Sequence, residues 1–163
     1  MKGGKTPMNV RNKEKGFTII EVVLVLAIAG LIFLMVFIAL PALQRSQRDT
    51  QRRDDVSRFM SQLNSYSTNN RGAIVTSQAT LNTFANSYLK AASGEFSDPK
   101  TGTRYTTTLQ SGATNGTAVP AEGVMYYHYR AKCSGETAVA GGAREAAVRV
   151  QLEGGGVYCQ SNK

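Results

Sequence analysis

The longest apolar stretch of the chain covers residues 22–40 and contains no charged or strongly polar side chain. As an α-helix it would be about 28 Å long, close to the roughly 30 Å thickness of a bilayer's hydrocarbon core. Because such a helix is apolar on every side, it needs lipid or other apolar helices around it. The pattern therefore predicts a membrane helix, or a helix that packs among the same helices of neighbouring copies.

A helix with a single apolar face is predicted directly after it. Residues 44–58 are polar and rich in arginine and aspartate. Apolar residues then recur at helical spacing: Val56, Phe59, Met60, Leu63 and Tyr66. We predict one helix over about residues 17–68, with Gly72 as a left-handed cap after its end. Its second half should pack on a globular head through this stripe.

Charges in the polar stretch are spaced for contacts along one face of the helix. Arg45 and Asp49, and Arg58 with Asp54 or Asp55, are three or four residues apart, a spacing that allows ion pairs. Two interpretations stay open. The stretch is either a solvated helix face at the membrane surface or a set of salt bridges between subunits.

The rest of the chain predicts a small mixed domain. A second short helix is expected over residues 77–93, with Ser77 as its cap. Alternation of apolar and polar residues predicts strands over residues 124–133 and 147–152. Two further strands are expected over residues 104–109, which are rich in threonine and tyrosine, and over residues 157–160, after a turn of three glycines. The expected fold class is α+β: a long N-terminal helix, with an apolar transmembrane half and an amphipathic half, packed on a small antiparallel sheet of three to four strands.

The chain has two cysteines, Cys133 and Cys159. Both fall at strand positions whose neighbours face inward, and a disulfide between them would contribute about 3.5 kcal/mol in the chain-entropy model. The alternative is a zinc site of His128, Cys133 and Cys159, which has three ligands at most and no closely spaced cysteine pair. Otherwise His128 is expected to be an exposed strand residue, and no metal or other cofactor is expected.

A basic leader and one carboxylate precede the apolar stretch. Residues 1–16 contain five lysines or arginines and a single acid, and Glu21 lies where the apolar stretch begins. A charge drawn to the bilayer centre costs roughly 2.5–3.5 kcal/mol. Three interpretations compete. They are a secretory signal peptide, for which the stretch is too long, an ordinary single-pass anchor, and a segment cut after Gly16 that leaves the helix on the mature protein.

The residues Gly16-Phe17-Thr18-Ile19-Ile20-Glu21, followed by an uninterrupted apolar helix, resemble the class III signal of type IV pilins and pseudopilins. The resemblance implies that a membrane aspartyl peptidase cuts between Gly16 and Phe17 and methylates the new amine of Phe17. Glu21 then occupies the position of the family's glutamate, and Gly30 and Pro41 match its helix-weakening positions less tightly. A disulfide-bounded C-terminal loop is also similar to the family's.

The chemistry of the cut agrees with this resemblance. Removing the leader creates an ammonium group on Phe17, one helical turn from Glu21, which offsets part of the cost of the carboxylate. Between neighbouring chains, Glu21 can pair with the Phe17 amine of another subunit inside an apolar bundle. A buried ion pair stabilises weakly but specifies register, because a misplaced subunit leaves a charge unpaired.

The expected organisation has four parts: a cleaved leader (1–16), a transmembrane or filament-core helix (17–43), an amphipathic helix (44–71) and a globular pilin head (72–163). The resemblance implies a structural subunit of a type IV pilus, serving adhesion, twitching motility or DNA uptake. Its partners would be its own copies, the prepilin peptidase and the pilus assembly platform protein. The precursor would lie in the cytoplasmic membrane with the N-terminus inside and the head outside, and the filament on the cell surface.

Two alternatives remain beside the pilus subunit. A type II secretion pseudopilin has the same N-terminal signal, and its major form typically has a calcium site near the C-terminus. The other alternative is a membrane-anchored binding module that does not polymerise. No nucleophile motif, phosphate loop or paired buried carboxylates are visible in the sequence, so no enzyme is expected.

The net charge of +8 raises the question of nucleic-acid binding. Arg130, Lys132, Tyr126 and Arg149 fall on predicted strands and would form a basic aromatic patch, able to contact phosphates and stack on bases. The simpler interpretation is an ordinary solvated sheet face. DNA is therefore a conceivable partner without further support.

Overall fold

The computed structural model describes residues 16–162. Most of the predicted leader, residues 1–15, lies outside the described residues. The chain divides into two compact units at the boundary between Leu40 and Pro41, and each is described separately. Helix α1 (Ile19–Asn69) contributes residues to both.

The first unit contains the apolar part of α1. Its large apolar side chains are exposed, as at Leu24 (58%), Phe33 (63%) and Phe37 (73%). By length and composition α1 is able to cross a membrane. The predicted apolar helix is thus present, and its large side chains are exposed within residues 16–162.

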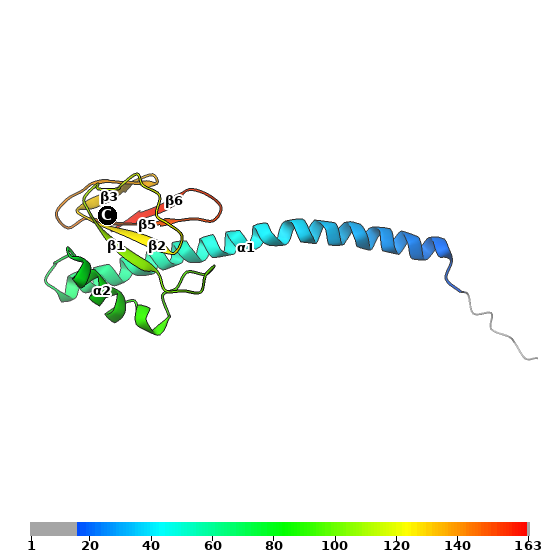
Figure 1. Cartoon of the computed structure of the whole chain (residues 1–163), viewed down its shortest axis with the longest axis horizontal. Helices are drawn as coiled ribbons and strands as arrows, with labels where there is room; N and C mark the ends of the chain where they lie inside the picture. The colour runs from blue at the N-terminus through cyan, green and yellow to red at the C-terminus, as the bar shows by residue number, and fades with distance from the viewer. Residues whose placement is uncertain (1–15, 163) are drawn as a thin grey trace, which may run out of the picture. The chain divides into compact units, whose positions relative to one another are not determined.

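The second unit combines the C-terminal part of α1 with short helices and strands (Figure 1). Helix α2 (Gln78–Ser87) is followed by a 3-10 turn, η1 (Ala91–Ser93). The strands are β1 (Thr106–Ser111), β2 (Val124–Tyr129), β3 (Ala131–Ser134), β4 (Thr137–Ala140), β5 (Ala146–Gln151) and β6 (Val157–Ser161). The α+β fold class is confirmed.

The ends of the helices follow local chain chemistry. Helix α1 ends where Arg71 and Gly72 take positive φ angles, and the Gly72 amide donates to the Ser67 carbonyl at 2.7 Å. This confirms the predicted left-handed cap. Ser77 caps α2 by accepting from the Thr80 amide. The second helix is shorter than the predicted 77–93, because Lys90 adopts φ 52° and separates α2 from η1.

The main sheet has the order β1-β2-β5-β6 and is mixed. The β1 and β2 strands are parallel, whereas β2–β5 and β5–β6 are antiparallel. The predicted sheet was wholly antiparallel, and this detail is wrong because residues 112–123 carry the chain back along the sheet before β2 begins. The predicted strand over residues 124–133 is two strands, since Arg130 takes φ 55° and turns the chain into a separate β3–β4 hairpin.

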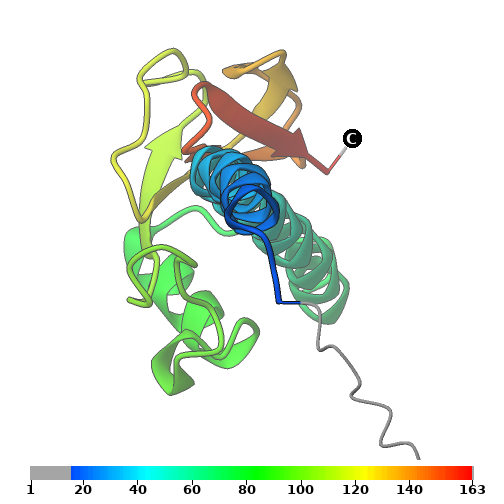
Figure 2. The same cartoon turned by 90° about the vertical axis from the view of Figure 1, so that its right-hand side faces the viewer.

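The core lies where α1, α2 and one face of the main sheet meet, with α2 and the sheet on different sides of α1 (Figure 2). Phe59 is its centre: its ring centroid lies 5.1 Å from that of Phe84 and 5.7 Å from that of Tyr127. The predicted stripe on α1 is confirmed, with Val56, Phe59, Met60 and Leu63 buried and Tyr66 partly buried. This packing places the polar part of α1 beside the loops of the head.

A disulfide joins Cys133 on β3 to Cys159 on β6, with a Cα–Cα distance of 5.8 Å. A small cluster of Ala131, Ala138 and Ala147 packs around the two half-cystines. The disulfide therefore attaches the β3–β4 hairpin to the main sheet. It also leaves neither sulfur as a thiolate, which rules out the alternative zinc set of His128, Cys133 and Cys159 in this form of the protein.

Candidate functional site

The start of α1 is a reciprocal hydrogen-bonded cap between Thr18 and Glu21. The backbone amide and the hydroxyl of Thr18 each donate to Glu21 Oε2 at 2.8 Å. In return, the Glu21 amide donates to the Thr18 carbonyl at 3.1 Å and lies 3.4 Å from Thr18 Oγ1. This is a capping box, in which threonine and a glutamate three residues later satisfy each other's free groups.

The capping box changes the expected role of Glu21 before cleavage. Sequence reasoning assigned the carboxylate to the Phe17 amine and placed the helix start at Phe17, whereas α1 begins at Ile19. The spacing of Thr18 and Glu21 is a recognised helix-start signal and was readable from the sequence. Pairing of Glu21 with the Phe17 amine stays a prediction for the processed chain.

The peptide bond between Gly16 and Phe17 precedes the helix and is open to a partner. Neither residue is in regular secondary structure, and the Phe17 side chain is 89% exposed. A Cβ atom added to Gly16 would meet nothing within 4 Å, so the chain itself does not require glycine there. A need for glycine would have to come from a protease cleft, which an extended glycine peptide enters closely.

Gly30 and Pro41 both lie inside α1, which continues through them as an α-helix. Proline removes one helical hydrogen bond, and glycine lowers helix propensity by about 1 kcal/mol relative to alanine. Neither effect interrupts the helix. Weakening at these two positions during assembly remains a prediction.

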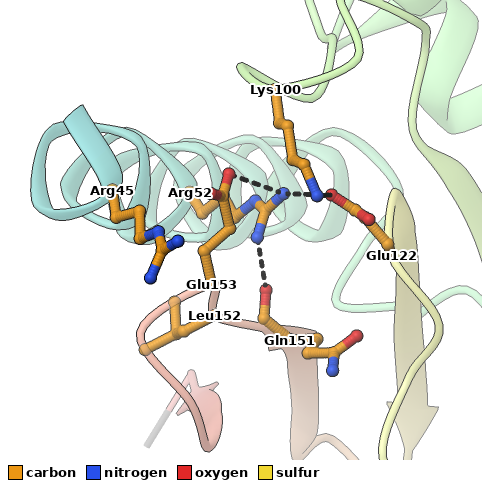
Figure 3. Close-up of a pocket in the computed structure, with 7 residues that line it drawn as sticks. All are labelled: Arg45, Arg52, Lys100, Glu122, Gln151, Leu152 and Glu153. Carbon is orange, nitrogen blue, oxygen red and sulfur yellow. Dashed lines mark hydrogen bonds and ion pairs between the residues drawn. The ribbon is translucent and has the colours of Figure 1, made fainter. Parts of the chain in front are cut away.

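A second candidate site is a charged cluster built around Arg52, which sequence reasoning did not identify. Arg52 is only 1% exposed, and its Nε donates to Asp98 Oδ2 at 2.8 Å. Its Nη1 donates to the Gln151 carbonyl at 3.2 Å, and Nη2 lies 3.6 Å from Glu153 Oε1 (Figure 3). The same Nη2 lies 3.5 Å from Glu122 Oε1, so three segments far apart in sequence converge on a single guanidinium group.

The loop between β5 and β6 is attached to α1 by further contacts. Arg48 donates to both carboxylate oxygens of Glu153, at 2.7 and 2.8 Å. Asp49 accepts from the backbone amides of Glu153 and Gly154 at 2.7 and 2.8 Å. A Cβ atom at Gly154 would lie 2.9 Å from Asp49 Oδ2, so this close approach favours glycine. Asp49 thus binds the head rather than Arg45.

The other predicted pairs along the helix are also replaced by contacts with the head. Arg58 lies 3.5 Å from Glu95 and donates to the Glu95 carbonyl at 3.0 Å. Asp55 accepts a hydrogen bond from the hydroxyl of Tyr105 at 3.0 Å. The predicted spacing does allow contacts along the helix, but Arg58 and Asp55 contact residues of the folded head instead.

The electrostatics of the cluster favour its charged state. Burial by itself would raise the pKa of Asp98, but hydrogen bonds from Arg52 and from the amides of Thr101 and Lys100 outweigh burial and lower that pKa. Hydrogen bonding to Arg48 likewise lowers the pKa of Glu153. The cluster is suited to holding three loops against α1. Its carboxylates already have cationic partners, so they are not poised as acids or bases.

A cavity of about 390 Å³ lies beside this cluster. It is lined by Arg45, Arg52, Lys100, Glu122, Gln151, Leu152 and Glu153 (Figure 3). Lys100 and Glu122 form an ion pair at 2.7 Å at its edge. The cavity is thus polar, with both signs of charge on its walls.

The predicted basic aromatic patch is not assembled as expected. Arg149 is 1% exposed and donates to the carbonyls of Glu136 and Asn115 at 2.9 and 3.0 Å. Arg130 and Lys132 are exposed, and Tyr126 is half-buried. Arg149 is covered because the β3–β4 hairpin folds over this face of the sheet, so it is not available to DNA on the surface.

The expectation that His128 is exposed is also wrong. His128 is fully buried, and its Nδ1 lies 3.1 Å from the Gly112 carbonyl. Burial lowers the pKa of its imidazole, and the nearby Arg149 acts in the same direction. Within residues 16–162, no group of three or more histidine, cysteine or acidic side chains could hold a metal ion.

The comparisons with known proteins concern the first of these two sites. Residues 11–37 match the family model described as the prokaryotic N-terminal methylation motif. No curated protein and no solved structure matches the chain. The motif is the hallmark of type IV pilins and pseudopilins and confirms the class III signal at the start of the chain. It supports a secreted subunit of the pilin or pseudopilin kind.

Proposed function

We propose that this chain is the precursor of a type IV pilus subunit, cut between Gly16 and Phe17 and methylated on the Phe17 amine. The observation that carries the proposal is the methylation motif at residues 11–37, which coincides with a helix start and an exposed apolar helix. The motif, the helix start and the exposed apolar helix could each occur in another kind of protein. A filament subunit that is stored in a membrane requires all three together.

The apolar part of α1 would have two successive environments. In the precursor, lipid would cover the apolar side chains that are exposed within the described part of the chain. In the filament, the same part of neighbouring copies would replace the lipid. Since both environments are apolar, the transfer changes little hydrophobic free energy, and specific polar contacts then decide the register between copies.

Glu21 would be the first of these contacts. In the uncut chain its carboxylate is occupied by the amide and hydroxyl of Thr18. The cut adds a cationic amine at Phe17, so the carboxylate gains a charged partner in its own chain or in a neighbour. Because an unpaired charge in an apolar bundle is costly, only copies in the correct register would be accepted.

The disulfide supports the proposed location. Disulfides persist in oxidising compartments outside the cytoplasm, and Cys133–Cys159 lies in the part of the chain assigned to the head. The head would therefore face outward, with the leader in the cytoplasm within reach of the prepilin peptidase. The assembly platform protein would then extract the processed subunit into a filament at the cell surface.

A pilus subunit is favoured over a type II secretion pseudopilin by the state of Glu153. Glu153 is the acid of the C-terminal tail, where a calcium site would be expected in a major pseudopilin. Both of its oxygens accept from Arg48, and Arg52 lies close to one of them. A carboxylate held by two guanidinium groups is a poor calcium ligand. A melting temperature that rises with calcium would reverse this preference.

The experiment is mass measurement on the full chain expressed in cells that contain a prepilin peptidase and the pilus assembly machinery. We expect a mature protein that begins at Phe17 and carries one additional methyl group. Gly16→Val should remain uncut, whereas the matched control Gly4→Val in the same leader should be processed. A mature N-terminus at another residue would refute the proposal, as would the absence of filaments on cells with correctly processed protein.

A further inference from the structure

The polar stretch of α1 contains two charged residues whose side chains have no partner among residues 16–162. Within residues 44–58, six charged side chains contact residues of the head: Arg48, Asp49, Arg52, Arg53, Asp55 and Arg58. The side chains of Arg45 and Asp54 form no hydrogen bond or ion pair with any of the described residues. One cation and one anion are therefore left over.

These two residues lie on opposite faces of the helix. They are nine positions apart, which is about two and a half turns and about 13 Å along the axis. Arg45 shares a face with Arg52, nearly two turns away, and lines the same cavity (Figure 3). Asp54 is exposed on the face that points away from the head's core.

This arrangement suits a contact between copies rather than within one chain. Complementary groups on opposite faces of one element form a heterologous contact, and such contacts, when offset along an axis, generate open helical filaments. A closed two-fold dimer would instead bring identical faces together. The charges themselves select the partner, because Arg45 needs an anion and α1 presents one at Asp54.

The cavity explains how Asp54 would reach Arg45. It measures about 390 Å³, is open at the surface, and has Arg52 and Lys100 on its walls besides Arg45. The acids that line it are already bound: Glu153 to Arg48, and Glu122 to Lys100. Arg45 is thus the lining cation without a partner among the described residues. One carboxylate from outside the chain would pair with it, and every lining charge would then have a partner of opposite sign.

We propose that Asp54 of one subunit enters the Arg45 cavity of a neighbouring subunit and forms an ion pair with Arg45. This inference rests on the proposed filament function. The pair would define the axial offset between heads, whereas Glu21 would define register within the apolar bundle. Two separate polar contacts would then specify the same arrangement of subunits.

A charge exchange tests the pair in cells that assemble the full chain. Arg45→Glu and Asp54→Arg should each reduce the filament sheared from cells about tenfold or more, because each places like charges together. The double variant Arg45→Glu/Asp54→Arg should restore assembly to within about twofold of wild type. Gln51→Arg, which adds a cation at another exposed position of α1, is the matched control and should assemble normally.

Two results of this experiment would overturn the inference: normal assembly of either single variant, and failure of the double variant to recover. Normal assembly of Asp54→Arg beside a defect in Arg45→Glu would point to a lipid phosphate as the partner of Arg45. The mass of the membrane-bound subunit is measured in parallel. Wild-type protein with no cut at Phe17 and no filaments would overturn the proposed function as well, so the two failures are distinguishable.

Cysteine crosslinking provides a second, direct measurement. In filaments of Arg45→Cys/Asp54→Cys, mild oxidation should produce a ladder of covalent oligomers that reduction removes. Either single variant should give no ladder. Filaments of the double variant that yield no ladder would also contradict the proposed contact.

Discussion

Arg52 and Asp98 form an ion pair that is almost completely removed from solvent. Two guanidinium nitrogens of Arg52, Nε and Nη2, each lie 2.8 Å from Asp98 Oδ2, and the side chains are 2% and 0% exposed. The other oxygen of Asp98 accepts from the amides of Lys100 and Thr101. The pair joins α1 to the segment before β1, and its geometry leaves neither charge without a partner.

The first prediction is that Asp98→Ala destabilises the protein strongly. The variant leaves the Arg52 guanidinium buried without its main partner, and breaking a buried pair in this way costs about 3–5 kcal/mol. Urea unfolding of the full chain in detergent, followed by tyrosine fluorescence, measures the change. Lys100→Ala removes an exposed ion pair with Glu122 and should cost under about 1 kcal/mol. Equal losses for both variants would show that burial of the Arg52 pair has no special weight.

The second prediction concerns pH and Asp55. Burial raises the pKa of Asp55 to about 6, although the hydrogen bond from Tyr105 and the charge of Arg58 act against it. The folded state therefore binds more protons than the unfolded state between about pH 4 and 6. The stability due to Asp55 is present at low pH and is lost as pH rises through 6.

Asp55→Asn should remove this dependence and keep the hydrogen bond from Tyr105. His128 has a lowered pKa and acts in the opposite sense at similar pH, so the informative quantity is the difference between variant and wild type. We expect the free energy of unfolding of Asp55→Asn, relative to that of wild type, to be higher at pH 8 than at pH 5. The increase should be about 1–2 kcal/mol, which allows for the partial exposure of Asp55. Asp54→Asn, on the exposed face, is the control. A difference that does not vary with pH would contradict the assignment.

The third prediction is that the Cys133–Cys159 disulfide stabilises the head. Replacing both cysteines by alanine opens a loop whose half-cystines are 26 residues apart. The chain-entropy model gives a loss of about 3.5 kcal/mol for such a loop. The midpoint of urea unfolding should fall for the double variant, and reducing agent should lower the wild type to a similar midpoint. An unchanged midpoint in both experiments would be evidence against a stabilising role.

The fourth prediction separates the two roles of Glu21. Glu21→Ala should still be cut at Gly16 but should assemble poorly, because a subunit without the carboxylate lacks its register contact. Thr18→Val removes the hydroxyl donor of the cap yet leaves the carboxylate, so it should cost about 1 kcal/mol of helix stability and still assemble. Intact mass and the yield of sheared filament report on the two steps. Normal filaments from Glu21→Ala would remove the proposed role.

Local patterns in the sequence were sufficient for the apolar stripe and the cap of α2, because the controlling contacts there are short in range. The stripe from Val56 to Leu63 and the Ser77 cap follow from the periodicity and hydrogen bonding of a helix. The cap between Thr18 and Glu21 belongs to the same class, although the carboxylate was first assigned to another partner. These features depend on residues within one or two turns of each other.

Long-range contacts were out of reach for such patterns. In the sequence, Arg52 is not distinguishable from the other arginines on a polar helix face. Its partner Asp98 is 46 residues away along the chain. His128 and Arg149 alternate with apolar residues as exposed positions should, but a second layer of chain covers them. The periodicity of a strand cannot predict that a hairpin will fold over the outer face of its sheet.

The sequence by itself determined the membrane-length helix, the cut site motif and the apolar stripe, because each is a property of neighbouring residues along the chain. The tertiary structure alone decided which charges on α1 pair within the head and which have no partner among the residues that the structure describes. That outcome depends on loops before β1, before β2 and after β5 reaching the same turns of the helix. Arg45 and Asp54 stand out only after those partners have been counted, because a free charge is defined by the contacts of all the others.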